Sequence, residues 1–83
     1  MASKISYKAS VEKDLKRLDR PIAARIVKKL EQVLGGDPDT GEPLVGEFKG
    51  CFKYRIGDHR VIYTKAVDGI LVLRIGHRKE IYR

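Results

Sequence analysis

The chain has 83 residues, of which 35% are charged, and it carries a net charge of +7 at neutral pH. Its length fits a single small domain, which we expect to span residues 1–83, and its one cysteine excludes an internal disulfide and a cysteine-rich zinc site. No apolar run approaches the roughly 20 residues that cross a membrane, so we expect a cytoplasmic protein without a membrane partner.

The first part of the chain has the pattern of one strand followed by two helices. Residues 4–8 alternate in polarity and predict a short strand. Ser10 is a suitable N-cap for a first helix that runs to about residue 18, because apolar residues recur after it at helical spacing. Pro21 fits the first turn of a second helix, which the glycine pair 35–36 ends. We expect an antiparallel helix pair whose apolar stripes cover another surface.

The second part of the chain predicts a loop and three strands. The loop covers residues 36–47, where proline and glycine are frequent. The strands that follow have the approximate ranges Phe48–Ile56, His59–Ala66 and Ile70–His77. Together these elements predict an α+β fold, in which a small, twisted, mainly antiparallel four-stranded sheet carries both helices on one face.

The first hairpin decides how the charged residues are arranged. A two-residue loop at Gly57 and Asp58 suits a tight hairpin and places Arg55 opposite Arg60. Because side chains alternate along a strand, one face carries these two arginines and Lys53, while the other face carries large apolar residues. We therefore expect one face for a core and one face for a negatively charged ligand.

The second hairpin is expected to turn through three residues, 67–69, with the glycine in a left-handed conformation. In that register Ala66 lies opposite Ile70, and Arg74 joins the charged face. The apolar face then gains Leu71, Leu73 and Ile75.

Most of the excess charge lies in the strands. Residues 48–83 carry nine basic and three acidic side chains, against nine and eight in residues 1–47. Like charges directly opposite each other destabilise a sheet, so Arg55 and Arg60 gain from an anion between them. A solvated basic surface is the alternative reading of this pattern. We expect a phosphate-binding surface, which indicates nucleic acid as the ligand class.

Three segments of the second part carry a resemblance to a known family. They are Gly50–Arg55, Gly57–Tyr63 and Leu73–Arg78, followed by Tyr82. With the order of the elements, they make the chain similar to the RelE/ParE superfamily of bacterial and archaeal toxins. The resemblance implies the toxin of a type II toxin–antitoxin system. Its RelE-like branch implies an endoribonuclease that cleaves messenger RNA in the ribosomal A site, with the RNA's own 2′-hydroxyl as nucleophile.

The resemblance also implies which residues act. Lys53 and Arg55 match two basic positions of one strand, and Arg60 matches the arginine after the hairpin. Two positions depart from the RelE pattern, because Arg55 stands where a lysine is typical and His77 stands where a lysine can occur. The candidate catalytic residues are Lys53, Arg55, Arg60, His77, Arg78 and Tyr82.

These residues suit different chemical tasks. Arg60 and Arg78 suit the charged transition state, because a guanidinium group binds phosphate oxygens bidentately. Lys53 lies among arginines whose like charge disfavours its protonated form, so it is a candidate acid or base, as are Tyr82 and His77. We expect no metal and no cofactor, because the two histidines have no suitable carboxylate cluster beside them.

Two other functions fit the same residues. A ParE-like toxin would poison DNA gyrase without cutting RNA, and a basic nucleic-acid-binding domain would bind without catalysis. The set of Lys53, Arg55, Arg78 and Tyr82 favours the nuclease over the gyrase poison, and mapping of cuts on translating ribosomes would distinguish it from the non-catalytic domain. The expected partners are a cognate antitoxin with an acidic or amphipathic segment, together with the ribosome and messenger RNA.

Overall fold

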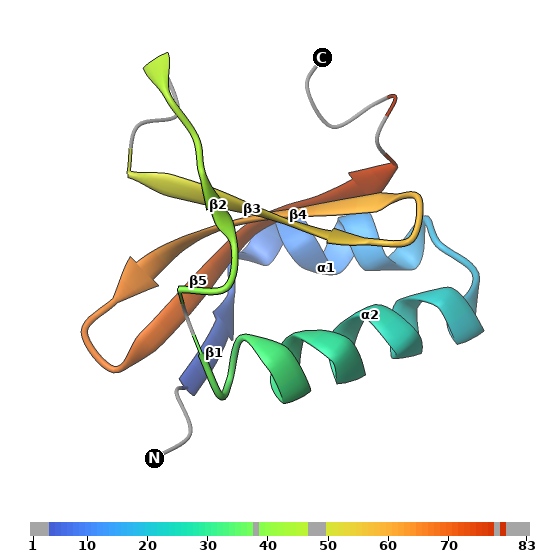
Figure 1. Ribbon diagram of the computed structural model, residues 1–83. Helices are drawn as coiled ribbons and strands as arrows, with labels where there is room; N and C mark the ends of the chain where they lie inside the picture. The colour runs from blue at the N-terminus through green and yellow to red at the C-terminus, as the bar shows by residue number, and fades with distance from the viewer. Residues whose placement is uncertain (1–3, 38, 47–49, 78, 80–83) are drawn as a thin grey trace.

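A computed structural model describes residues 4–37, 39–46, 50–77 and 79 (Figure 1). Arg78 and Tyr82, two of the candidate catalytic residues, lie outside the described residues. In chain order the elements are β1 (Lys4–Tyr7), α1 (Ala9–Lys16), α2 (Arg20–Val33), β2 (Glu42–Pro43), β3 (Cys51–Ile56), β4 (His59–Ala66) and β5 (Gly69–His77).

Within the described residues the strands form one sheet in the order β1-β5-β4-β3-β2. β1 pairs with β5 in parallel, and each of the other neighbouring pairs is antiparallel. The predicted α+β class is confirmed, but the sheet has a fifth strand, β2, in a segment that the sequence predicts as loop. Because β2 has only two residues, no alternation in the sequence could indicate it, and its pairing with β3 alone defines it.

Both helices lie on the same face of the sheet (Figure 1). Between the two layers lies a core of aliphatic side chains and one tyrosine, each less than a tenth exposed. This burial is the main source of stability, at about 1.5–3 kcal/mol for each large apolar side chain. The core residues are Val11, Ile26, Leu30, Leu34, Ile56, Val61, Tyr63, Ile70, Val72 and Ile75.

The start of α1 differs from the prediction. Lys8 donates its backbone N–H to the carbonyl oxygen of Val72 at 3.0 Å, which keeps it extended beside β5, and the helix begins directly after it at Ala9. Ser10 therefore lies inside the first turn, and its predicted role as N-cap is wrong. α2 begins as predicted, with Pro21 in its first turn. Neither helix in the described part of the chain is long and apolar enough to cross a membrane.

The first hairpin has the predicted register, with Arg55 directly opposite Arg60. Gly57 has a φ of 60°, the left-handed conformation that a tight two-residue hairpin turn requires. β3 begins at Cys51, while the predicted start at Phe48 lies outside the described residues. The face opposite the helices therefore carries the predicted row of basic residues.

The second hairpin turns through two residues, 67–68, instead of three. Ala66 consequently pairs with Gly69, and the predicted pairing of Ala66 with Ile70 is wrong. A shift of one residue exchanges the two faces of a strand. At the start of β5 the buried core residues are therefore Ile70 and Val72.

A β-bulge at Leu73 returns β5 to the predicted faces. Successive residues of β4 pair with Val72 and then with Arg74, which leaves Leu73 as the extra residue. The prediction that Leu71 and Leu73 reach the core is wrong, because both are only half-buried. Ile75 is buried in the core and Arg74 is exposed, as predicted.

Candidate anion-binding site

Four charged side chains surround a hollow on the face of the sheet opposite the helices. The hollow measures about 210 Å³ and is lined by Glu42, Lys53, Arg55 and Arg60. Glu42 comes from β2, Lys53 and Arg55 from β3, and Arg60 from β4, three strands that lie side by side (Figure 1). The structure thus brings together three of the residues that the sequence singles out, and adds a carboxylate.

The two arginines of the hollow lie directly opposite each other. Arg55 donates from Nε to the carbonyl oxygen of Gly57 at 3.2 Å, and Arg60 donates from Nη1 to the carbonyl oxygen of His59 at 3.3 Å. Among the described residues no carboxylate forms a salt bridge with either guanidinium group. Both positive charges therefore remain available to an anion in the hollow.

Lys53 and Glu42 face each other across β3 and β2. The Nζ atom of Lys53 lies 3.8 Å from Oε2 of Glu42, and 78% of the Glu42 side chain is exposed. An ion pair this exposed contributes at most about 1 kcal/mol to stability. Its significance is chemical, because it places a proton acceptor and a proton donor side by side at the wall of the hollow.

Glu42 is a candidate site residue that sequence reasoning missed. It precedes Pro43 in a segment rich in glycine and proline, which is the signature of a loop. A proline is also tolerated in an edge strand, and this was the only signal that β2 could be part of the sheet. The pairing of Glu42 with Lys53 is a tertiary contact that no local pattern encodes.

Arg74 extends the charged face beyond the hollow. In the sheet register Ile62 lies between Lys53 on β3 and Arg74 on β5. Ile62 is only 4% exposed although it lies opposite the core face, and the aliphatic stems of its two basic neighbours are placed to cover it. The basic face therefore includes one buried apolar side chain, Ile62, between its charged residues.

His77, in contrast, lies on the helix-bearing face. It pairs with His59 across β4 and β5, and the ring centroids are 5.7 Å apart. Its Nδ1 atom accepts the backbone N–H of Lys79 at 3.2 Å. His77 is not among the residues that line the hollow of Glu42, Lys53, Arg55 and Arg60. The structure therefore separates this candidate from the basic residues with which the sequence grouped it.

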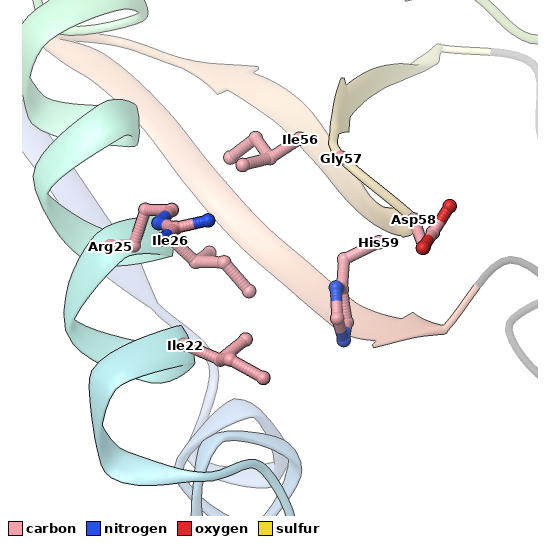
Figure 2. A pocket seen from close by; sticks show the side chains of 7 residues that line it. All are labelled: Ile22, Arg25, Ile26, Ile56, Gly57, Asp58 and His59. Atoms are coloured by element: carbon pink, nitrogen blue, oxygen red, sulfur yellow. The ribbon is translucent and has the colours of Figure 1, made fainter.

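A second hollow lies on the helix-bearing face, between α2 and the turn from β3 to β4 (Figure 2). It measures about 250 Å³. Figure 2 shows the apolar side chains of Ile22 and Ile26 extending from α2 into a space that Ile56 and His59 border from the strand side, with Arg25 next to Ile26. Its lining is completed by Gly57 and Asp58. This hollow is mainly apolar, which suits a protein side chain better than a phosphate.

Comparison with known families identifies the chain. The family model that matches is described as the ParE toxin of the type II toxin–antitoxin system, parDE, and it matches residues 5–82. Among curated proteins no sequence match was found.

Several solved structures share the fold. A chain of the RelBE2 toxin–antitoxin complex from Mycobacterium tuberculosis is 26% identical, with a TM-score of 0.86, and the match covers 96% of this chain and 95% of that chain. The isolated RelE toxin of E. coli is 22% identical, with a TM-score of 0.72 and coverage of 98% and 92%. The protein HP0894 from Helicobacter pylori is 23% identical, with a TM-score of 0.72 and coverage of 95% and 98%.

The predicted RelE-like fold is thereby confirmed. The family match spans nearly the whole chain, from the second residue of β1 through the end of β5. The chain belongs to the ParE toxin family of type II toxin–antitoxin systems, within the RelE/ParE superfamily.

Proposed function

We propose that this toxin is an endoribonuclease that cuts messenger RNA in the ribosomal A site and so inhibits translation. The observation that carries the proposal is the hollow in which Arg55 and Arg60 face each other, with no carboxylate of the described residues paired to either. Such a pair of like charges costs stability unless an anion lies between them, and an RNA phosphate has the matching charge and geometry.

The proposed reaction is an internal phosphoryl transfer. The 2′-hydroxyl oxygen of one nucleotide attacks the adjacent phosphorus, a bond forms between them, and the bond from phosphorus to the next 5′-oxygen breaks. The products are a 2′,3′-cyclic phosphate and a 5′-hydroxyl. Arg55 and Arg60 bind the non-bridging oxygens, whose negative charge grows in the transition state. The reaction needs no metal, because side chains can supply each of these functions.

Two proton transfers accompany this reaction. The 2′-hydroxyl must lose a proton, and the leaving 5′-oxygen must gain one. Glu42 as a carboxylate and Lys53 as an ammonium group lie 3.8 Å apart at the wall of the hollow. We assign proton acceptance to Glu42 and proton donation to Lys53, because an ionised carboxylate can only accept and an ammonium group can only donate.

Three candidates from the sequence, Arg78, Tyr82 and His77, are not among the described residues that line the hollow. Arg78 and Tyr82 lie outside the described residues, and their proposed roles in charge stabilisation and proton transfer rest on the family motif. His77 contacts His59 on the helix-bearing face, so its participation would require the RNA to pass around the end of β5.

Primer extension on translating ribosomes tests the proposal. Purified toxin is added to a defined messenger RNA, and the new 5′ ends of the downstream fragments are mapped. We expect cuts confined to A-site codons, lost in Arg60→Ala and retained in Arg25→Ala, since Arg25 lies in the other hollow. Transcripts that stay intact with the wild-type toxin would contradict the proposal.

A second candidate function is inhibition of DNA gyrase, which the name of the matching family favours. A gyrase supercoiling assay separates the two. Inhibited supercoiling together with intact transcripts would support the gyrase poison and overturn the nuclease. RNA that binds without being cut, with gyrase unaffected, would indicate a non-catalytic nucleic-acid-binding domain.

We also propose a cognate antitoxin as partner, in the same cytoplasmic compartment as the ribosome. Several structures similar to this chain are complexes of a toxin with its antitoxin. An amphipathic acidic segment would suit the hollow of Figure 2, where Arg25 and His59 border isoleucine side chains. Expression of the toxin alone should arrest growth, and healthy cells at full induction would count against this proposal.

A further inference from the structure

Glu42 is held in the hollow by a short segment that runs along the edge of β3. We call residues 39–43 the strap. Only two residues of the strap pair with β3, Glu42 with Lys53 and Pro43 with Phe52. Proline has no backbone N–H to donate, but the backbone N–H of Leu44 donates to the carbonyl oxygen of Cys51 at 2.9 Å. The chain is therefore tied to β3 on the C-terminal side of Glu42, and the position of its carboxylate depends on a further attachment on the N-terminal side.

Tyr63 provides a second attachment for the strap, from the helix-bearing side of the sheet. Its hydroxyl oxygen accepts the backbone N–H of Gly41 at 3.0 Å, directly beside Glu42 in the chain. The rest of Tyr63 is fully buried in the core, and its ring stacks on Phe52 with centroids 5.5 Å apart. The hydroxyl is therefore a rigid anchor, because packing fixes the ring that carries it.

Gly41 makes this contact possible. A Cβ atom at position 41 would overlap the hydroxyl of Tyr63 and come within 2.9 Å of the carbonyl oxygen of Lys53. Real Cβ contacts are longer than this, so any other residue would push the strap away from the sheet. Tyr63 and Gly41 thus form a matched pair across 22 positions of sequence.

The contacts at the other end of the strap are at the surface. Asp39 forms an ion pair with Lys65, whose ammonium group lies 5.3 Å from the ring centroid of Phe52. Both partners are about half or more exposed, at 70% for Asp39 and 49% for Lys65, so this pair contributes little. The buried attachment at Tyr63 is the one expected to set the position of Glu42.

We infer that Tyr63 is a positioning residue of the anion-binding hollow, whose hydroxyl holds Glu42 beside Lys53 through Gly41. This inference rests on the proposed function, in which Glu42 accepts the proton of the 2′-hydroxyl. Burial, more than any other influence, raises the pKa of Tyr63, so the hydroxyl stays neutral at physiological pH and does not itself take that proton.

The test uses Tyr63→Phe, which removes the hydroxyl and keeps the ring. We expect kcat for A-site cleavage to fall about 10- to 100-fold, because a misplaced catalytic group loses rate steeply with distance. KM for the ribosome complex should stay within about twofold, because Arg55 and Arg60 are unchanged. Gly41→Ala changes the strap partner of the same contact. It should likewise lower kcat and leave KM within about twofold.

A double-mutant cycle with Glu42→Gln distinguishes positioning from general damage. If Tyr63 acts through Glu42, then adding Tyr63→Phe to Glu42→Gln should cause no further loss of kcat. Asp39→Asn is the matched control in the strap, and it should leave kcat within about twofold. An equal loss in both backgrounds would overturn the inference, as would a Tyr63→Phe toxin with the wild-type kcat.

A second measurement needs no activity. Nuclear Overhauser contacts between the side chains of Glu42 and Lys53 should be present in the wild type and lost in Tyr63→Phe. If the wild-type toxin cuts no RNA, the proposed function fails, and these contacts still decide whether Tyr63 positions Glu42. Contacts that persist in Tyr63→Phe would contradict the inference even in a fully active toxin.

Discussion

The two hollows beside the β3–β4 hairpin are similar in size and opposite in character. The hollow on the face opposite the helices, which we call the open hollow, measures about 210 Å³ and is lined by four charged side chains. The hollow on the helix-bearing face measures about 250 Å³ and has three isoleucines in its lining. Size therefore does not distinguish the two hollows as candidates for the proposed RNA site, whereas the surroundings of their arginines differ.

Arginine has a different environment in each hollow. Arg25 shares its hollow with Asp58 and lies above apolar side chains, which is an ordinary setting for a surface cation. Arg55 lies opposite Arg60, an arrangement that lowers stability and that folding alone does not require. Substitutions in the open hollow should therefore change activity and spare stability, and substitutions in the helix-side hollow should do the reverse.

Replacement of Arg60 should produce the largest effect on activity. We expect Arg60→Ala to lower the rate of A-site cleavage by about 10²–10³, the usual cost of losing one group that stabilises transition-state charge. Its free energy of unfolding should stay within about 0.5 kcal/mol of wild type. Time courses of primer extension and urea denaturation measure the two quantities.

Arg25→Ala is the matched control for Arg60→Ala, since it removes an arginine from the other hollow. It should leave the cleavage rate within about twofold, because Arg25 does not reach the proposed RNA site. Comparable losses of activity in the two variants would remove the distinction between the hollows.

Replacement of Ile26 should produce the largest effect on stability. Ile26 is 1% exposed and belongs both to the core and to the lining of the helix-side hollow. Ile26→Ala should cost about 2–5 kcal/mol of unfolding free energy, through lost burial and a residual cavity. Urea denaturation followed by circular dichroism measures this, with the exposed Gln32→Ala on the same helix as control. A cost below that of the control would show that α2 is not essential to the core.

Two tyrosines on the helix-bearing face should respond in opposite directions to loss of their hydroxyl. The buried hydroxyl of Tyr7 has no hydrogen-bond partner among the described residues, so Tyr7→Phe should stabilise the protein by about 1 kcal/mol. The hydroxyl of Tyr63 accepts from Gly41, so Tyr63→Phe should destabilise it by about the same amount. Denaturant midpoints compare the two, and shifts in the same direction would contradict this assignment.

The smallest predicted effect is a loss of stability at high pH. Burial, and then the nearby charge of Glu31, raises the pKa of Tyr7 above its ordinary value of 10.0. The folded protein then holds this proton more tightly than the unfolded chain, so stability is constant below that pH and falls as pH rises above it. The pKa of Lys65 is also raised, by its hydrogen bond with Asp39, and it acts in the same direction.

Tyr7→Phe isolates the contribution of Tyr7 to this alkaline effect, to which Tyr63, whose pKa is also raised by burial, contributes in the same direction. Unfolding free energies measured between about pH 8 and pH 11 should decline less steeply in the variant than in the wild type. Parallel curves would show that the Tyr7 hydroxyl titrates equally in the folded and unfolded states.

The sequence predicts the open hollow better than the strands around it. The alternation of Lys53 and Arg55 and the turn at Gly57 are local signals, and they were enough to place Arg55 opposite Arg60. The bulge at Leu73 has no such signal, because it depends on how β5 packs between β1 and β4. The faces of the first half of β5 were therefore predicted incorrectly.

The place of Glu42 in the lining of the open hollow could not be predicted for a similar reason. Glu42 lies beside Lys53 through the pairing of β2 with β3, and Gly41 next to it contacts Tyr63, a residue on a strand far along the chain. Its neighbours in sequence indicate a loop. Charge alternation within one strand is readable from the sequence, whereas the approach of a separate segment to that strand is a property of the folded chain.

The most direct test of the central claim is the position of the scissile phosphate. A ribosome complex with this toxin and a messenger RNA that carries a 2′-O-methyl group at the cleavage site can be examined by electron cryomicroscopy. We expect that phosphate in the open hollow, within hydrogen-bond distance of Arg55 and Arg60. A scissile phosphate on the helix-bearing face, or one that neither arginine contacts, would contradict the proposed site.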